Sequence, residues 1–496
     1  MRFLTNTITK ASISRCIIVN SSVQSTSFRS HARNGAPLSL FRATTAWPSS
    51  TFKPAAYPSS ASVTTAATAS PTPAQKTAES KPTVDVTVKV PSLPVSFEDI
   101  SRALYRIQSG IKRTHCDMSK FLSELCGCNI YLKKDFTQFT GSFKERGGRN
   151  SLMLLSPEAK KQGVITASAG NHALALAWHG KDLNIPVICV MPTTAPLAKV
   201  DKCRKFGANV ILHGEHIGEA KQFAQKEYPA LKYINGYDDP EIIAGAGTMG
   251  IEILEQTPNV EVILVPVGGA GLIAGVSLAV KTIRPDVQVI GVEPENVASY
   301  AAALKAGKPV NGFKEATLAD GLAVPVVGPT SFEVARHFVD DTCTVSEKMI
   351  ALAMLRLIEM DKLVVEGGGA AALAAILPGG PLFGKYNGKN VCVLLCGGNI
   401  DTSVLGRVID RGLAADHRLI RFSATVSDRP GGIAKLARDM ADLGVSVKDI
   451  YHERAWLHSR VDQVIVKCVV ETTGLAHSEK MFAALKEKGY PISERD

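Results

Sequence analysis

Short apolar runs alternate with amphipathic stretches through the middle of the chain. Turn residues bound each run, and the runs are Gly163–Ala167, Val187–Met191, Val210–Leu212, Val262–Val265, Val289–Val292 and Val391–Leu395. Uninterrupted apolar runs are typical of strands buried on both faces, and the helical stretches between them fit crossover connections. The pattern predicts an α/β fold with parallel sheets, from a helix near Ser96–Ile107 to about residue 412.

The pattern of apolar and polar positions changes after about residue 418. A strand, a helix, two strands and a second helix fit Leu419–Val426, Gly432–Leu443, Val445–Tyr451, Val461–Val470 and Glu479–Lys488. This β-α-β-β-α order predicts a small ferredoxin-like α+β domain over residues 418–496.

Residues 1–80 follow neither pattern. They are rich in Ser, Thr, Ala, Pro and Arg, and no acidic residue precedes Glu79. This composition is typical of an organellar transit peptide with a linker, so we expect a disordered targeting segment, mitochondrial rather than plastid because arginine appears at once. A disordered tail without a targeting role is the alternative. The apolar stretch Cys16–Val19 is too short for a secretory signal, and no apolar run could span a bilayer.

The formal net charge of +10 would suggest a nucleic acid or a membrane surface as partner if it were spread over the fold. Eight Lys and Arg residues precede Glu79, however, so the rest of the chain is nearly neutral and neither partner is expected. The 10 cysteines are scattered, which favours a reducing compartment over a disulfide framework. The close pair Cys126 and Cys128 has no further Cys or His at zinc-finger spacing, so it predicts no metal site.

One lysine stands in a setting that suits covalent chemistry. The segment Gly141-Ser-Phe-Lys-Glu-Arg-Gly147 follows a short strand, Ile130–Lys133, and opens a helix that ends near Leu155. Burial beside Phe143 would lower the pKa of Lys144, and a neutral amine can attack an aldehyde. Alone the motif is weak, because Lys and Arg on a helix usually form a solvated face.

Three more motifs stand where an apolar run ends. Ser168-Ala-Gly-Asn-His172 begins with a natural N-cap, behind which free amides could bind a carboxylate. In Val267-Gly-Gly-Ala-Gly-Leu272, several backbone N–H groups could point at one phosphate. The alternatives are a simple tight turn and a dinucleotide-binding loop, although the glycine spacing fits the latter poorly. Leu395-Cys-Gly-Gly-Asn399 places a thiol where open α/β sheets bind ligands, or is a buried cysteine before a turn.

The four motifs in this order resemble the β-family, or fold type II, of pyridoxal phosphate enzymes, specifically the threonine and serine ammonia-lyases and the serine racemases. The resemblance covers roughly residues 95–412, and residues 418–496 resemble an ACT regulatory domain. It implies two parallel-sheet subdomains, pyridoxal 5'-phosphate as cofactor, a small amino acid as substrate and a homo-oligomer, either a dimer or a tetramer.

The resemblance also implies roles for individual residues. Lys144 would form a Schiff base with the cofactor and later act as the base at the substrate Cα. Ser168 would hold the substrate carboxylate together with Asn171, which would also bond the phenolic oxygen of the cofactor. The remaining cofactor contacts would be Phe143, the phosphate loop of Gly268, Gly269, Ala270, Gly271 and Leu272, and then Gly321, Glu366 near the ring and Cys396 at the pyridine nitrogen.

One departure separates the branches of this family. Serine racemases carry a serine at the position of Ala169, and alanine has no proton to give to the opposite face of Cα. We therefore expect an L-threonine and L-serine ammonia-lyase rather than an amino-acid racemase. Glu293 matches a cation ligand of the racemase branch, but Ser299 stands where aspartate is expected, so no metal site is predicted.

Two further alternatives stay open. A catalytically silent amino-acid sensor could use the same fold, and a nucleotide-dependent oxidoreductase is the least favoured choice. In the C-terminal module, Asp428-Arg-Pro-Gly-Gly432 stands at the turn after the first strand, where ACT domains bind effectors. The resemblance implies allosteric control by an amino acid or a nucleotide, and a docking domain without ligand is the alternative.

Overall fold

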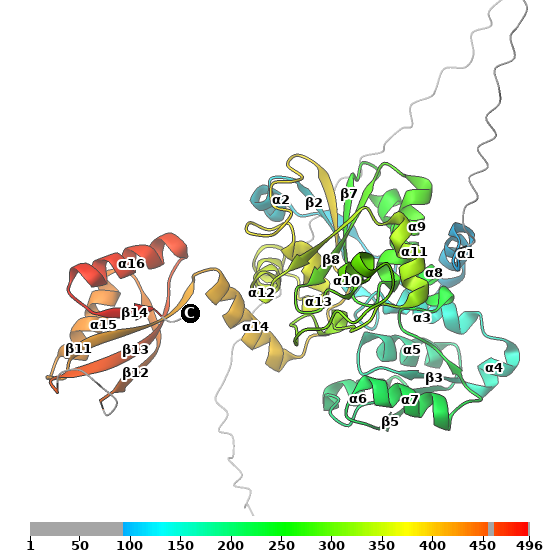
Figure 1. The fold of residues 1–496 in the computed structure, drawn as a ribbon, viewed down its shortest axis with the longest axis horizontal. Helices are drawn as coiled ribbons and strands as arrows, with labels where there is room; N and C mark the ends of the chain where they lie inside the picture. Colours follow the sequence, from blue (N-terminus) through cyan, green and yellow to red (C-terminus); the bar gives the residue numbers. More distant parts are fainter. Residues whose placement is uncertain (1–92, 455–460, 495–496) are drawn as a thin grey trace, which may run out of the picture. The chain divides into compact units, whose positions relative to one another are not determined.

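The computed structural model describes residues 93–454 and 461–494. The expected transit segment and linker, residues 1–80, lie outside these ranges. Within them the chain forms two mainly parallel sheets and then a separate antiparallel sheet (Figure 1).

Six strands form the larger parallel sheet, in the order β1-β2-β10-β7-β8-β9. All neighbours run parallel except β1, which pairs antiparallel with β2. Their bounds are β1 Cys116–Met118, β2 Asn129–Lys133, β7 Val262–Pro266, β8 Gln288–Pro294, β9 Asp341–Val345 and β10 Asn390–Leu394. The central strands are apolar and buried on both faces, as their uninterrupted runs predict.

The smaller sheet has the order β5-β4-β3-β6, and all its pairs are parallel. Its strands are β3 Val164–Ala167, β4 Val187–Met191, β5 Asn209–Leu212 and β6 Lys232–Tyr233. The first three coincide with predicted strands to within one residue. The two residues of β6 were not predicted, because so short a run gives no periodicity to detect.

Helices connect and cover these strands. They are α1 Phe97–Ile107, α2 Lys120–Cys126, α3 Lys144–Met153, α4 Pro157–Gln162, α5 Asn171–Asp182, α6 Leu197–Lys205, α7 Ile217–Glu227, α8 Pro240–Gln256, α9 Gly271–Ile283, α10 Ser299–Ala306, α11 Pro329–Phe338, α12 Glu347–Arg356, α13 Gly367–Ala374 and α14 Thr402–Ala415. Figure 1 shows α6 and α7 beside the smaller sheet. The fold begins at α1, as predicted, and Ser96 caps this helix in a capping box with Asp99.

The C-terminal module is a four-stranded antiparallel sheet with the order β12-β13-β11-β14. Its elements are β11 Leu419–Ser427, α15 Gly432–Asp442, β12 Ser446–Glu453, β13 Gln463–Glu471, α16 Leu475–Glu487 and β14 Ile492–Glu494. The last strand was not predicted, and it pairs with β11 to complete the ferredoxin-like β-α-β-β-α-β order. The predicted α+β class of this module is confirmed, with one strand added.

Among the helices of the described residues, none has the length and apolarity that crossing a membrane requires.

Candidate functional site

Lys144 is the first residue of α3 and lies at a cavity, not on a solvated helix face. Its Nζ donates a hydrogen bond to the carbonyl oxygen of Gly236. Burial lowers the pKa of Lys144 from its ordinary value of 10.5 to about 8. About a tenth of this amine is therefore neutral at pH 7, far more than for a lysine in water.

The cavity has a volume of about 410 Å³, part of which is open to solvent. Three of the four predicted motifs contribute to its wall, together with the 319–325 segment and Tyr237. Its lining residues are Phe143, Lys144, Tyr237, Pro266, Gly268, Gly269, Ala270, Gly271, Leu272, Ile273, Gly321, Leu322, Val324 and Cys396.

The glycine-rich loop between β7 and α9 is pressed against its neighbours. A Cβ atom on Gly269 would lie 2.3 Å from the ring of Tyr237, and one on Gly271 would lie 2.1 Å from the Tyr237 carbonyl oxygen. Side chains at these positions would therefore block the close approach of the backbone. Ala270, with φ 70°, is held in the left-handed region that favours glycine.

Helix α9 begins at Gly271, the last glycine of the loop. Among the described residues no side chain caps this helix end, so the N–H groups of its first turn face the loop. These amides and the helix dipole favour an anion at the cavity wall.

A hydrogen-bonded cluster joins the second motif to the fourth. Asn171 Nδ2 donates to Glu366 Oε1 at 2.7 Å, and Asn399 Nδ2 donates to Asn171 Oδ1 at 2.9 Å. The Asn399 N–H donates to the other carboxylate oxygen of Glu366 at 3.2 Å. Burial, and then the charge of Asp320, raise the pKa of Glu366 to about 7. Glu366 lies close to the cavity wall, because a Cβ on Gly321 would be 3.4 Å from its Oε1.

Cys396 connects the fourth motif to the lysine motif. Its carbonyl oxygen accepts from the Phe143 N–H at 2.9 Å, and its Sγ lies 3.5 Å from the Gly368 carbonyl oxygen. Burial raises the pKa of this thiol, so Cys396 presents a neutral S–H group.

The prediction that Ser168 caps a helix is wrong. Helix α5 begins at Asn171, and its N-cap is Gly170, so the helix starts three residues after Ser168. The Ser168 hydroxyl instead accepts from the Gly170 N–H at 3.3 Å, which closes a local turn. Ser168 stands at the carboxyl end of β3 and is not among the residues that line the cavity.

The sequence interpretation missed the segment after β6. Gly236 accepts the lysine hydrogen bond, and Tyr237 lines the cavity and covers the glycine loop. The signal was present as an Asn-Gly pair, Asn235-Gly236, which is typical of a tight turn. The side chain of Asn235 accepts from the N–H groups of Tyr237 and Asp238, as such a turn requires.

Arg146 is buried, unlike most charged residues on a helix, and the sequence motif does not indicate this. Its guanidinium is fully buried and forms two hydrogen bonds each with Asp135 and Glu252, at 2.7 to 2.9 Å. Lys133 donates to the same Glu252 at 2.6 Å, so two cations balance two carboxylates. Such an arrangement fixes the start of α3, two residues beyond Lys144.

Glu145, the second residue of α3, forms further buried contacts. Arg149 donates to His179 Nδ1 at 3.1 Å, so the proton of that imidazole is on Nε2 and points to Glu145 Oε2, also 3.1 Å away. The other oxygen of Glu145 accepts from the Thr140 N–H. Lys144 is therefore followed by two anchored side chains.

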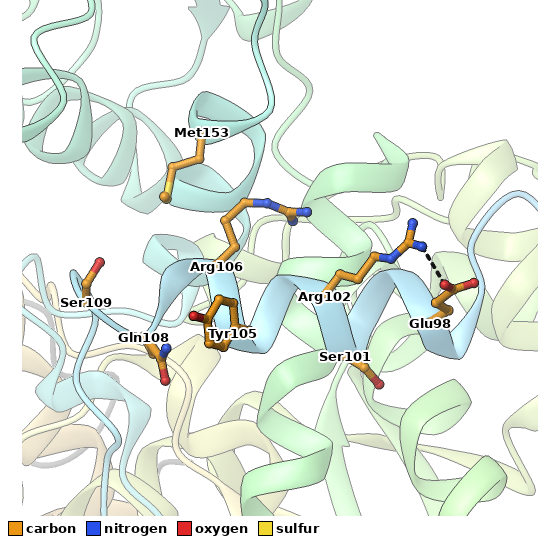
Figure 2. Close-up of a pocket in the computed structure, with 8 residues that line it drawn as sticks. All are labelled: Glu98, Ser101, Arg102, Tyr105, Arg106, Gln108, Ser109 and Met153. Carbon is orange, nitrogen blue, oxygen red and sulfur yellow. Dashed lines mark ion pairs between the residues drawn. The ribbon is translucent and has the colours of Figure 1, made fainter.

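A second hollow, a groove along the exposed face of α1, contains none of the predicted site residues. Figure 2 shows Tyr105 and the ion pair between Arg102 and Glu98 on this helix face, with Met153 nearby. The chemistry of the site therefore belongs to the smaller cavity around Lys144.

The position that resembles a cation ligand has a different use here. The Glu293 carboxylate accepts from the N–H groups of Tyr300 and Ala301 at 2.7 and 2.8 Å, and so caps the start of α10. The Ser299 hydroxyl donates to the Val324 carbonyl oxygen at 2.7 Å. Within the described ranges no group of three or more His, Cys, Asp or Glu side chains gathers in a way that could hold a metal ion.

The cavity fits a ligand that carries an aldehyde at one end and a phosphate at the other. The Lys144 amine can react with an aldehyde, and the amides at the start of α9 can bind a phosphate dianion without any side-chain charge. The neutral thiol of Cys396 lies in the wall of the same cavity. This donor set suits pyridoxal phosphate.

Comparison with known proteins agrees with this fit. Residues 107–397 match the family described as pyridoxal-phosphate dependent enzyme. The L-threonine ammonia-lyase of Thermotoga maritima is 40% identical over 402 residues, which cover 80% of this chain and 99% of that protein. The L-threonine ammonia-lyase of Geobacter sulfurreducens is 39% identical over 396 residues, 79% of this chain and 98% of its own length.

Solved structures are similar as well. Threonine deaminase isoform 2 from Solanum lycopersicum matches with a TM-score of 0.60 and 36% identity over 63% of this chain and 93% of that one. Serine racemase from Dictyostelium discoideum matches with a TM-score of 0.58 and 33% identity over 62% and 99% of the two chains. The fold alone therefore does not separate elimination from racemisation.

Proposed function

The chain belongs to the family of pyridoxal-phosphate dependent enzymes, and we propose from this that it is an ammonia-lyase acting on L-threonine and L-serine. The products are 2-oxobutanoate and ammonia from threonine, and pyruvate and ammonia from serine. The observation that carries the proposal is the reactive setting of Lys144 beside the glycine-rich loop, in a chain whose 40% identical relative is an L-threonine ammonia-lyase. That match covers 80% of this chain, more than the region 107–397 that the family model matches.

The residues of the cavity would hold the cofactor from several sides. Lys144 would bind it covalently, and the backbone of Gly268 to Leu272 would bind its phosphate. Phe143 and Gly321 would border the ring, while Asn171 and Glu366 form the polar cluster beside the cavity. Bound there, pyridoxal phosphate supplies an electron sink for the bond that breaks at the substrate Cα.

Lys144 would then serve as the base. Its pKa of about 8 leaves a neutral amine available to accept the Cα proton, and its hydrogen bond to Gly236 directs the amine. Cys396 would keep its own proton, because burial raises the thiol pKa, and so would leave the ring nitrogen without a full positive charge. Ser168 would hold the substrate carboxylate, which requires its hydroxyl to turn from the Gly170 N–H toward the cavity.

Racemisation is the second candidate, because serine racemases share the fold at 33% identity. Ala169 argues against it, since a two-base exchange at Cα needs a proton donor on the face opposite Lys144. Incubation of the purified chain with L-threonine and L-serine distinguishes the two. We expect 2-oxo acids without accumulation of the D-isomers, and faster formation of D-serine than of pyruvate would reverse the assignment.

We propose that the C-terminal module is an ACT domain that binds a small effector at the Asp428–Gly432 turn. Arg454 Nε donates to Asp428 Oδ1 at 2.9 Å there, and Gly431 has a φ of 96° that other residues rarely adopt. Steady-state rates with and without L-isoleucine, L-valine, AMP and ADP test this. Rates that respond to none of these compounds would favour a docking role.

Two further parts of the proposal rest on the sequence and on family resemblance. The composition of residues 1–80 supports import into mitochondria, with plastids as the alternative, and a fusion of this segment to a fluorescent protein would show its destination. A homodimer or homotetramer is expected by resemblance, and light scattering of the purified chain would measure it.

A further inference from the structure

The segment from Ile234 to Tyr237 contacts two parts of the proposed cofactor site, the lysine and the glycine-rich loop. Gly236 accepts the hydrogen bond from Lys144 Nζ, and the ring of Tyr237 packs against the Gly269 backbone. The segment continues from the edge strand β6, where the Ile234 N–H donates to the Ile165 carbonyl oxygen at 2.9 Å. What fixes this segment therefore also fixes the acceptor of the lysine amine.

His172 supports the segment from the first turn of α5. Its Nε2 lies 3.3 Å from the Ile234 carbonyl oxygen, and because a carbonyl only accepts, the proton of the imidazole is on Nε2. Its Nδ1 is buried without a hydrogen-bond partner among the described residues, so the ring is hydrogen-bonded there through Nε2 alone. Burial, followed by the charge of Lys144, lowers the pKa of His172 to about 3, so the ring is neutral.

The ring also makes direct contact with Gly236. A Cβ atom built on Gly236 would lie 2.8 Å from Cγ and 3.0 Å from Cδ2 of His172, so the imidazole packs on the Gly236 backbone with no room for a side chain. The imidazole thus holds the segment at two points, a hydrogen bond at Ile234 and a packing contact at Gly236.

We propose that His172 is a positioning residue for the reaction, which holds the Gly236 carbonyl where it accepts an N–H of Lys144 and so orients the amine that takes the Cα proton. This inference rests on the proposed function of Lys144. A neutral amine has two N–H groups and one lone pair, so fixing one N–H restricts the directions in which the lone pair can point. Misplacing a base by about 1 Å can cost on the order of a hundredfold in rate.

The imidazole can be replaced so that its donor and its bulk are tested separately. Glutamine can place an N–H near the Nε2 position, whereas asparagine reaches only the Nδ1 position and leucine fills the space without a donor. The matched control is Thr166→Val, which removes the other hydrogen bond to the Ile234 carbonyl oxygen, 3.0 Å long, and leaves the ring on Gly236.

The first measurement is amide hydrogen exchange of peptide 234–238 in the full chain freed of cofactor. We expect His172→Gln to exchange like wild type, and His172→Asn and His172→Leu to exchange about fivefold faster, as loss of one buried hydrogen bond allows. Unchanged exchange in both the asparagine and the leucine variants would overturn the proposal, as would equal loss of protection in the glutamine variant.

The second measurement is the turnover of the holoenzyme with L-threonine and with its Cα-deuterated form. In His172→Leu we expect kcat to fall about tenfold with KM within about twofold, and the deuterium effect on kcat to increase, because proton transfer has become slower. His172→Gln should restore both, and Thr166→Val should keep both. An equal loss in Thr166→Val would assign the effect to strand pairing and overturn the role of His172.

If the leucine and asparagine variants do not fold, nitrogen NMR of the histidines in the wild-type chain tests the proposal. The His172 signal is identified by its loss in His172→Gln. The proposal requires that the His172 ring carries its proton on Nε2. It also requires that the ring does not titrate between about pH 6 and pH 9, where an exposed histidine would lose its charge. The opposite tautomer would overturn it. A wild-type chain that makes no 2-oxo acid would refute the proposed function, while the exchange and NMR results would still judge the contact between His172 and Gly236.

Discussion

At the scale of single residues, the site combines groups whose surroundings change their ordinary chemistry. The Lys144 amine loses part of its charge through burial, and the Cys396 thiol keeps its proton for the same reason. The sequence identified both residues, because each belongs to a motif at a strand end. It could not identify Gly236 as the lysine's acceptor, since a backbone carbonyl leaves no mark in a side-chain pattern.

The tight contact at Gly271 gives the first prediction. A methyl group in Gly271→Ala would meet the backbone carbonyl of Tyr237 at 2.1 Å, and backbone cannot move aside as a flexible side chain could. We expect a loss of about 1 to 3 kcal/mol in the free energy of unfolding and weaker cofactor binding. Denaturant unfolding and a cofactor titration measure both quantities.

The matched control is Gly406→Ala on α14, where nothing lies within 4 Å of an added Cβ atom. Alanine should be neutral or slightly stabilising there. Equal behaviour of the two variants would contradict the packing argument.

Glu366 gives a prediction about pH. Its folded pKa of about 7 lies above the ordinary value of 4.5, so folding favours the protonated carboxyl group. The contribution of this group is fully present below about pH 4.5 and is lost as the pH rises toward 7 and beyond. Between pH 5 and 8 the wild type should lose on the order of 1 to 3 kcal/mol relative to Glu366→Gln, whose amide does not titrate.

Urea unfolding of the wild type and of Glu366→Gln at pH 5 and pH 8, without cofactor, measures this difference. Parallel changes in the two proteins would show that Glu366 ionises as it does in water.

At the scale of elements, the hydrophobic pattern predicted what depends on burial over several residues. The strands that carry apolar runs were placed correctly, whereas β1, β6, β9 and β14 were not predicted. Of these, β1, β6 and β14 have only two or three residues, and the five residues of β9 contain no apolar run. The start of α5 was misplaced because the Ser168 hydroxyl closes a local turn with the Gly170 N–H, and Gly170 rather than Ser168 is the N-cap. Tertiary context decided the burial of Arg146, since its partners Asp135 and Glu252 come from distant parts of the chain.

That buried cluster gives the prediction for helix α3. Removing the guanidinium in Arg146→Ala leaves two buried carboxylates with only Lys133 to balance them, which should cost about 3 to 5 kcal/mol of unfolding free energy. Arg102→Ala is the control, because its ion pair with Glu98 is exposed and worth roughly 0 to 1 kcal/mol. Chemical denaturation measures both, and similar small losses would mean that the cluster contributes little.

At the scale of the whole molecule, a parallel α/β region and an antiparallel C-terminal module follow one another along the chain. The order of motifs predicted the first, and the β-α-β-β-α rhythm predicted the second apart from its last strand. Substrate preference between threonine and serine was not predictable, because one methyl group in a pocket discriminates by only about 1 to 3 kcal/mol. The identity of an effector was not predictable either, because the backbone geometry of the Asp428–Gly432 turn carries no side-chain signature of a particular ligand.

The proposed threonine ammonia-lyase activity of this chain depends on Lys144. The most direct measurement is 2-oxobutanoate formation from L-threonine by the purified, cofactor-supplied chain, compared with Lys144→Ala and with Lys120→Ala, an exposed lysine at the start of α2. We predict turnover in the wild type and in Lys120→Ala, and a loss of at least about a thousandfold in Lys144→Ala. Wild-type rates in Lys144→Ala would show that Lys144 does not carry the reaction, and no 2-oxobutanoate from the wild type would show that the chain is not a threonine ammonia-lyase.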